Sequence, residues 1–165
     1  MSQDVPFTIH LEQREDYQFN MKFDWPDVPD LALDSGPPLG RSAGPDAERL
    51  LAGAVGYCLT ASLLFCMRKF KQTPGTLRTE VSGVLTRNER GRLRVGGLDA
   101  RIHLSDEAGQ IAHFDRCAQQ FEDFCVVSDS VRHGIDLKVE IVDAAGRKVY
   151  PEADVSGARE AEART

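Results

Sequence analysis

The sequence has no excess of positive charge, because its 20 lysines and arginines are outnumbered by 26 aspartates and glutamates, which leaves a net charge of −6. Nucleic acids and anionic membrane surfaces are bound through a positive field. We therefore expect no nucleic acid and no membrane as the main partner. The hydrophobic fraction of 41% and the charged fraction of 28% are typical of a globular protein, and 165 residues suffice for a sizeable core.

The first residues also lack the apolar run behind a basic region that marks a secretory signal. The longest apolar stretch, within residues 44–69, has charged residues at both ends and is rich in Gly, Ala, Ser and Thr, so we expect a core helix and not a membrane span. The predicted location is therefore cytoplasmic. In a reducing cytoplasm, cysteines are free, metal-bound or redox-active more often than they form structural disulfides.

The cysteines do not have the spacing of a zinc site. They form two pairs, Cys58 with Cys66 and Cys117 with Cys125, and the members of each pair are eight residues apart in a predicted helix. At ~1.5 Å rise per residue they lie about 12 Å apart, too far for one metal ion. If the two helices pack antiparallel, Cys58 opposes Cys125 and Cys66 opposes Cys117, near disulfide distance. The alternative is that all four are inert core residues.

What the sequence does contain is one segment apolar enough to fill a core, residues 44–69, GPDAERLLAGAVGYCLTASLLFCMRK. Pro45 suits the first position of a helix, and the acidic start and basic end of the segment fit the helix dipole. We predict a helix that is apolar nearly all round and is therefore enclosed by other elements.

Antiparallel strands are predicted on both sides of this helix. Residues 6–11 and 16–25 form a hairpin, whose second arm has a buried face of alternating apolar residues, Tyr17, Phe19, Met21, Phe23 and Trp25. Residues 26–44 are too rich in proline and glycine for regular structure. Residues 77–85 and 93–104 form a second hairpin with a bulge at Gly96-Gly97.

The last third of the chain is predicted to contain a helix and a strand. Residues 111–125 form an amphipathic helix, with Phe114, Cys117, Phe121 and Phe124 on one face. A short turn follows at residues 128–132, and residues 135–142 form the last strand. We predict a single domain over residues 1–150 and a disordered tail over residues 151–165.

Two runs together resemble the OsmC/Ohr family of hydroperoxide-reducing and stress-induced proteins: PLGRSAGPDAERLLAGAVGYCLTASL, and later FEDFCVVSDSVRHGIDLKVEIVD. In that family a helix start of the type Pro-x-x-Glu places a glutamate ten residues before a reactive cysteine, as Glu48 precedes Cys58 here. A second cysteine opens a segment like Cys-Pro-Val-Ser before the last strand. Cys125 stands at that place, with Val126 where the family has proline.

The resemblance implies an α+β, OsmC-like fold with antiparallel sheets around a long buried central helix, in an intertwined homodimer. It also implies a thiol peroxidase that needs no metal, flavin or other cofactor. Cys58 would be the peroxidatic cysteine, which becomes a sulfenic acid, and Cys125 would resolve it as a disulfide. Glu48 would hold an arginine that stabilises the thiolate. Arg41 is our assignment for that arginine, and Arg14 is the alternative.

The partners implied are a hydroperoxide and a thiol reductant, either a dithiol such as a lipoyl group or a thioredoxin-like protein. Two other functions stay open on the same fold: a small-molecule-binding protein whose cysteines do not turn over, and a cysteine-based redox sensor. Cys66 and Cys117 are additional to the family pattern, and are either packing residues or a second redox pair.

Overall fold

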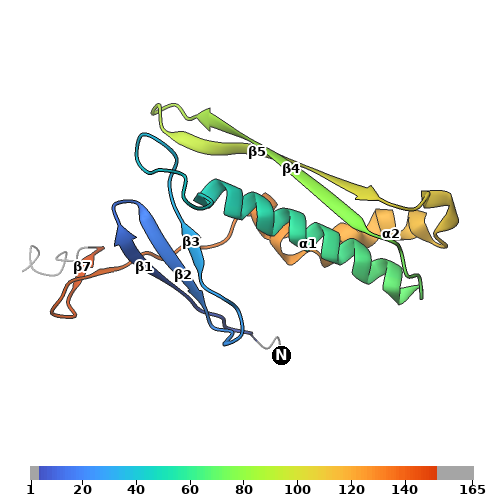
Figure 1. Ribbon diagram of the computed structural model, residues 1–165, viewed down its shortest axis with the longest axis horizontal. Coiled ribbons are helices and arrows are strands. Elements are labelled where there is room, and N and C mark those ends of the chain that lie inside the picture. The colour runs from blue at the N-terminus through green and yellow to red at the C-terminus, as the bar shows by residue number, and fades with distance from the viewer. Residues whose placement is uncertain (1–3, 152–165) are drawn as a thin grey trace, which may run out of the picture. The chain divides into compact units, whose positions relative to one another are not determined.

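The computed structural model describes residues 4–151, and its first part is a three-stranded antiparallel sheet. This sheet contains β1 (Ile9–Glu15), β2 (Gln18–Phe23) and β3 (Leu31–Leu33) in the order β1-β2-β3 (Figure 1). The predicted hairpin is present, with Ile9 opposite Phe23, but its first strand runs on to Glu15 instead of ending at residue 11. β3 corrects the prediction that residues 26–44 are wholly irregular. Its three residues pair with the free edge of β2, and a bond from the Asn20 amide to the Asp30 carboxylate joins β2 to the loop before β3.

The aromatic face predicted to be buried on the first hairpin is not buried within this chain. Trp25 is 71% exposed and Tyr17 is also exposed, while Phe19 and Phe23 are half-buried. The buried residue of β2 is instead the polar Asn20. This sheet therefore leaves apolar side chains uncovered.

The central helix, α1 (Ala47–Lys69), begins two residues later than predicted, because its first helical residue is Ala47 and not Pro45, and Asp46 is its N-terminal cap. The Asp46 side chain accepts a hydrogen bond from the backbone N–H of Arg49 at 2.9 Å, which satisfies one of the free amides of the first turn. The expectation that other elements enclose α1 on all sides is wrong for the single chain. Tyr57 is 78% exposed, and the buried residues lie on one side: Val55, Gly56, Leu59, Ser62, Leu63, Cys66 and Met67.

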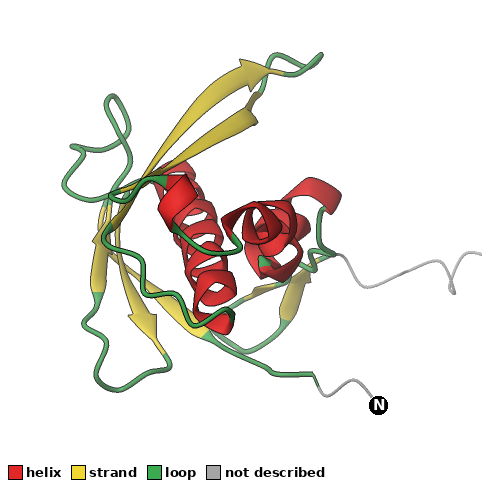
Figure 2. Cartoon of the chain, turned by 90° about the vertical axis from the view of Figure 1, so that its right-hand side faces the viewer, coloured by secondary structure: helices red, strands yellow, loops and turns green. Residues whose placement is uncertain are grey.

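That side of α1 packs on the second hairpin, β4 (Leu77–Arg87) and β5 (Leu93–Leu104), as Figure 2 shows. The approach is close at Gly56, where a Cβ atom would lie 2.7 Å from a methyl carbon of Val81. The predicted bulge is confirmed, since Val84 opposes Gly97 and Leu85 opposes Val95. The far end of the hairpin is left exposed, including the apolar residues Val84, Leu85, Leu93 and Val95.

The prediction of one continuous helix over residues 111–125 is wrong. The segment contains α2 (Phe114–Gln120) and the 3₁₀ turn η2 (Phe121–Phe124), after a separate 3₁₀ turn η1 (Ala108–Gln110). α2 begins after His113, whose φ of 62° lies in the left-handed region, and the chain is extended again at Cys125. α3 (Val126–His133) follows. The apolar face survives these breaks, because Cys117 is fully buried and Phe121 packs on α1 residues.

The chain divides into two units at Asp129/Ser130, and the second is described by itself. It contains a small antiparallel pair, β6 (Ile141–Val142) with β7 (Lys148–Tyr150), which Asp143 and Arg147 close through a side-chain ion pair of 2.7 Å. Of the strand predicted over residues 135–142, only the last two residues pair. The tail predicted over residues 151–165 lies, apart from Pro151, outside the described residues, and the single domain over residues 1–150 stays a prediction.

By length and composition, α1 is the one helix among the described residues that is apolar enough to cross a membrane. Its contacts explain this composition, because α1 packs against β4, β5, α2 and η2. The prediction of an α+β fold, with antiparallel sheets and a long central helix, is confirmed.

Candidate functional site

Cys58 and Cys125 lie together, although 67 residues separate them in the sequence. Cys58 is half-buried on α1, and Cys125 stands between η2 and α3 with an exposed fraction of 1%. The Cys58 side chain packs against the buried cluster that contains Cys125, and the interaction between the two thiols shifts the pKa of both. The pair is packed in an apolar cluster formed by Val55, Leu59, Leu98, Ile102, Phe121 and Val127. The structure therefore places opposite each other the two cysteines that antiparallel packing predicted.

The surroundings of Cys125 favour a negative charge on its sulfur. Cys125 occupies the position before the first residue of α3, where free backbone amides point outward. The backbone N–H of Ser128 donates to the Cys125 Sγ atom at 3.4 Å. Burial alone would raise the pKa of Cys125, but hydrogen bonds from Cys58, Ser128 and Val127 outweigh it and hold the pKa below its ordinary value.

Cys58 has the opposite balance. Burial raises the pKa of Cys58, and its hydrogen bond with Cys125 raises it further, while contacts with the amides of Val127 and Val126 offset only part of this. In the isolated chain these contacts therefore favour the thiolate of Cys125 over that of Cys58. Access favours reaction at Cys58, because its side chain is more exposed than that of Cys125. Reaction at Cys58 thus needs an additional positive charge.

The structure does not bring Arg41 and Glu48 to each other. The Arg41 guanidinium pairs with Glu15 on β1 at 2.8 Å. Glu15, and not Glu48, therefore has the expected role of holding the arginine. Glu48 is exposed in the first turn of α1 and lines a cavity of about 350 Å³ over the β4–β5 hairpin. Ten residues along the helix amount to about 15 Å, so Glu48 does not reach Cys58. Arg14 lies exposed on β1.

Cys66 and Cys117 form a second apposed pair. They pack in one cluster between α1 and α2, and both side chains are almost fully buried. Burial, and then the hydrogen bond with Cys66, raise the pKa of Cys117 to about 12. Within residues 4–151, no group of three or more His, Cys, Asp or Glu side chains is arranged to hold a metal ion.

Two features of the site were missed by sequence reasoning. The first is Ser128, predicted only as the start of a short turn, whose backbone N–H donates to the Cys125 sulfur. The second is Asp34, which is buried and accepts the backbone N–H groups of Arg41 and Ala43 at 2.9 and 3.0 Å. Asp34 thereby fixes the loop that contains Arg41 and leads into α1. An aspartate just before a glycine- and proline-rich loop was the available signal.

The protein is thus an α+β fold of antiparallel sheets in which each of two cysteines on the long core helix lies beside a cysteine of a later segment. Of these two pairs of thiols, Cys58–Cys125 is the more accessible. The chain belongs to the OsmC-like protein family, whose model matches residues 40–140. No curated protein matches the chain.

Solved structures share the fold at low sequence identity. An OsmC-like protein of unknown function from Vibrio cholerae has a TM-score of 0.62 at 15% identity, over 77% of this chain and 94% of that one. An organic hydroperoxide resistance protein OsmC from Legionella pneumophila has a TM-score of 0.61 at 14% identity, over 82% and 96%. The organic hydroperoxide resistance protein OhrB of Bacillus subtilis has a TM-score of 0.57 at 20% identity, over 80% and 96%.

Proposed function

We propose that this protein is a thiol-dependent peroxidase that reduces organic or small hydroperoxides through Cys58 and Cys125. The contact between the two thiols at the centre of the fold is the observation that carries the proposal. The names of the Legionella and Bacillus structures, both organic hydroperoxide resistance proteins, support the choice of substrate class.

Cys58 is the peroxidatic residue because it is the more accessible sulfur. Its thiolate attacks the terminal peroxide oxygen, an S–O bond forms as the O–O bond breaks, and the alcohol leaves with a proton. Cys125 then attacks the Cys58 sulfur. The hydroxide of the sulfenic acid leaves as water with the proton of the second thiol, and a disulfide remains. An external dithiol, such as a lipoyl group or a thioredoxin-like protein, returns the two electrons.

Arg41 is the proposed source of the charge that Cys58 needs. Its backbone is fixed by Asp34, and its guanidinium is exposed and, within residues 4–151, held only by the equally exposed Glu15. Exposed ion pairs contribute about 1 kcal/mol or less, so a thiolate or a second copy of the chain can compete for this side chain. The proposed assembly is an intertwined homodimer, in which the apolar side chains exposed on β1 and on the far end of the β4–β5 hairpin are covered.

The pH profile of Cys58 alkylation is expected to identify the arginine. Since burial raises the pKa of Cys58, little thiolate is present at neutral pH unless a guanidinium favours it. Arg41→Ala should shift the profile to higher pH by about one unit or more. Arg14→Ala is the matched control. A shift in that variant alone would assign the role to Arg14, and no shift in either would remove both arginines from the proposal.

The peroxidase itself is tested by mass spectrometry of the intact protein after one equivalent of tert-butyl hydroperoxide. We expect the loss of two hydrogen atoms, and peptide mapping should locate the new disulfide at Cys58 and Cys125. Addition of a dithiol should restore the starting mass. A protein that stays fully reduced would instead indicate a binding protein on this fold, and oxidation without recovery by any dithiol would indicate a sensor.

A further inference from the structure

Cys66 and Cys117 are two thiols that the proposed peroxidase does not use. Cys66 lies on α1, two helical turns from Cys58, and Cys117 lies on α2. Because the rise along the helix puts Cys66 about 12 Å from Cys58, the two pairs do not exchange directly. The second pair is therefore a separate centre, in its own apolar cluster with Leu63, Met67 and Ile111.

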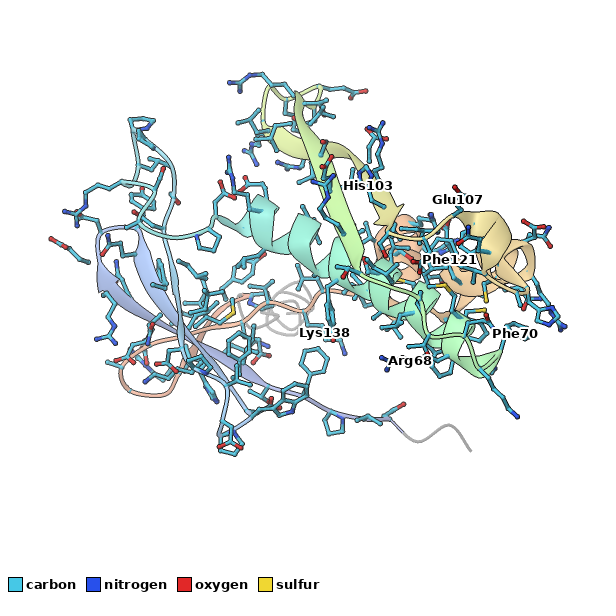
Figure 3. All side chains as sticks on the ribbon, turned by 45° about the vertical axis from the view of Figure 1, so that its right-hand side comes forward. Arg68, Phe70, His103, Glu107, Phe121 and Lys138 are labelled. Carbon is cyan, nitrogen blue, oxygen red and sulfur yellow. The ribbon has the colours of Figure 1, made fainter. Side chains whose placement is uncertain are left out.

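A cavity of about 260 Å³ borders one member of this second pair, Cys66. Cys66 forms part of its wall, and the remaining lining residues are Lys69, Phe70, Arg116, Gln120 and Phe124. Figure 3 shows Phe70 and Phe121 in the part of the molecule where α2 and η2 pack along α1. Among the described residues, the cavity is thus lined by two cations and by no carboxylate.

Aromatic rings fix both cations at the cavity. The Lys69 Nζ atom lies 5.2 Å from the centre of the Phe124 ring, and the Arg116 guanidinium lies 5.4 Å from the centre of the Phe70 ring. Such contacts orient a cation without neutralising it. A small ligand that enters this cavity therefore meets positive charge beside the Cys66 side chain.

We propose that Cys66 and Cys117 form a second dithiol–disulfide site, which reacts with small anionic disulfides that enter through this cavity. Core packing accounts for two buried thiols, but it does not account for a cavity that combines one of the two cysteines with two fixed cations and no anion. The small volume limits the ligand to a compact molecule, and the charge selects carboxylate-bearing ones.

The reaction is two successive thiol–disulfide exchanges. Cys66 attacks one sulfur of the ligand, an S–S bond forms between them, and the other half of the ligand leaves as a thiolate that takes up the proton of Cys66. Cys117 then attacks the Cys66 sulfur and gives its proton to the second ligand thiolate. Two electrons pass to the ligand, which becomes two thiols, and a Cys66–Cys117 disulfide remains.

The order of the two steps follows from the site. Cys66 lines the cavity, whereas Cys117 is fully buried behind it. The pKa of Cys117, raised to about 12, keeps that residue protonated and able to donate a hydrogen bond to the Cys66 sulfur. The same contact holds Cys117 beside the mixed disulfide that it must resolve.

The test uses the full chain with Cys58→Ser and Cys125→Ser, so that Cys66 and Cys117 are the remaining thiols. The probes are dithiodipropionate, which is dianionic, and cystamine, a dication of similar size. Each rate is divided by the rate of the same protein in denaturant, which removes the intrinsic reactivity of the probe. We expect a Cys66–Cys117 disulfide by peptide mapping, and a normalised rate about tenfold higher for the anionic probe, the size of one or two partly screened charge contacts.

Three variants complete the test. Lys69→Gln with Arg116→Gln should remove the charge preference, while the matched control Arg68→Gln, on the next position of α1 but outside the cavity, should keep it. Cys117→Ser should accumulate a stable adduct on Cys66. Reaction only in denaturant, equal normalised rates for the two probes, or an adduct that persists while Cys117 is present would each overturn the proposal. If the serine variants fail to fold, peptide mapping of the unsubstituted protein after reaction with the same probes shows whether the Cys66–Cys117 disulfide forms.

Discussion

Replacing Cys58 by serine is expected to abolish peroxide consumption while the fold is kept. Serine is nearly isosteric with cysteine, but its hydroxyl is not a nucleophile at neutral pH without a neighbouring base. Position 58 is half-buried at the edge of its cluster, so the polar hydroxyl retains access to water. The measurement is the loss of tert-butyl hydroperoxide in the presence of a dithiol, with circular dichroism as the check on folding.

The contrasting variant is Cys125→Ser, in which attack at Cys58 remains but the second thiol is missing. Cys58 should then accumulate as sulfenic acid and become overoxidised at excess peroxide, because nothing converts it to a disulfide. Labelling with a sulfenic-acid reagent should be strong in this variant and weak in the wild type. Equal labelling in the two proteins would exclude Cys125 as the resolving residue.

Cys66→Ser is the matched control for both variants, because it removes a thiol of α1 that lies two turns from the first pair. We expect it to retain peroxide consumption. Activity near the wild-type level in Cys58→Ser would contradict the peroxidase proposal, whereas loss in all three variants would indicate a general effect on α1.

The sequence predicts best where a pattern is local and long. The apolar run of residues 44–69 with charges of opposite sign at its ends identifies α1, and the alternation around Gly96-Gly97 identifies a bulged hairpin. The equal spacing within the two cysteine pairs predicts their apposition, because two antiparallel segments that align one pair also align the other. The helix and the hairpin follow from patterns within single segments, and the apposition of the cysteines needs only the two spacings and antiparallel packing.

The sequence predicts least where distant contacts decide the conformation. The spacing of Phe114, Cys117 and Phe121 continues through the 3₁₀ turn η2, so periodicity does not reveal that the helix ends before Cys125. The alternation of residues 135–140 predicts a strand, but a strand needs a partner, and none pairs with it among the described residues.

The charges of the site are equally hidden from local patterns. Arg41 and Glu15 are 26 residues apart, and the loop that presents the arginine depends on backbone bonds to a buried aspartate. A motif gives the spacing of Glu48 and Cys58, but it does not give the partner of either side chain. For this reason the two cysteines are better supported by the structure than the assisting glutamate and arginine.

The protein is expected to be an obligate homodimer, and removal of residues 1–25 is expected to unfold it. The first sheet has three strands, the third of them short, with Trp25 and Tyr17 exposed, and Tyr57 of α1 is also exposed. Small sheets need a packed apolar face to be stable, and exposed apolar patches of this kind mark interaction surfaces. We expect the second copy to cover them with an interface above ~2,000 Å².

A point variant separates dimerisation from folding. Leu11→Lys, on the exposed apolar side of β1, should weaken the dimer, whereas Glu89→Lys places the same side chain in the exposed turn between β4 and β5 and should leave the dimer intact. Sedimentation velocity at micromolar concentration gives the mass, and peroxide consumption on the same samples gives the activity. Because the guanidinium of Arg41 is proposed to reach Cys58 only in the assembled protein, activity should fall together with the dimer fraction in Leu11→Lys. A stable, fully active monomer of the wild-type chain would show that one chain completes the site by itself, and would overturn the proposed assembly.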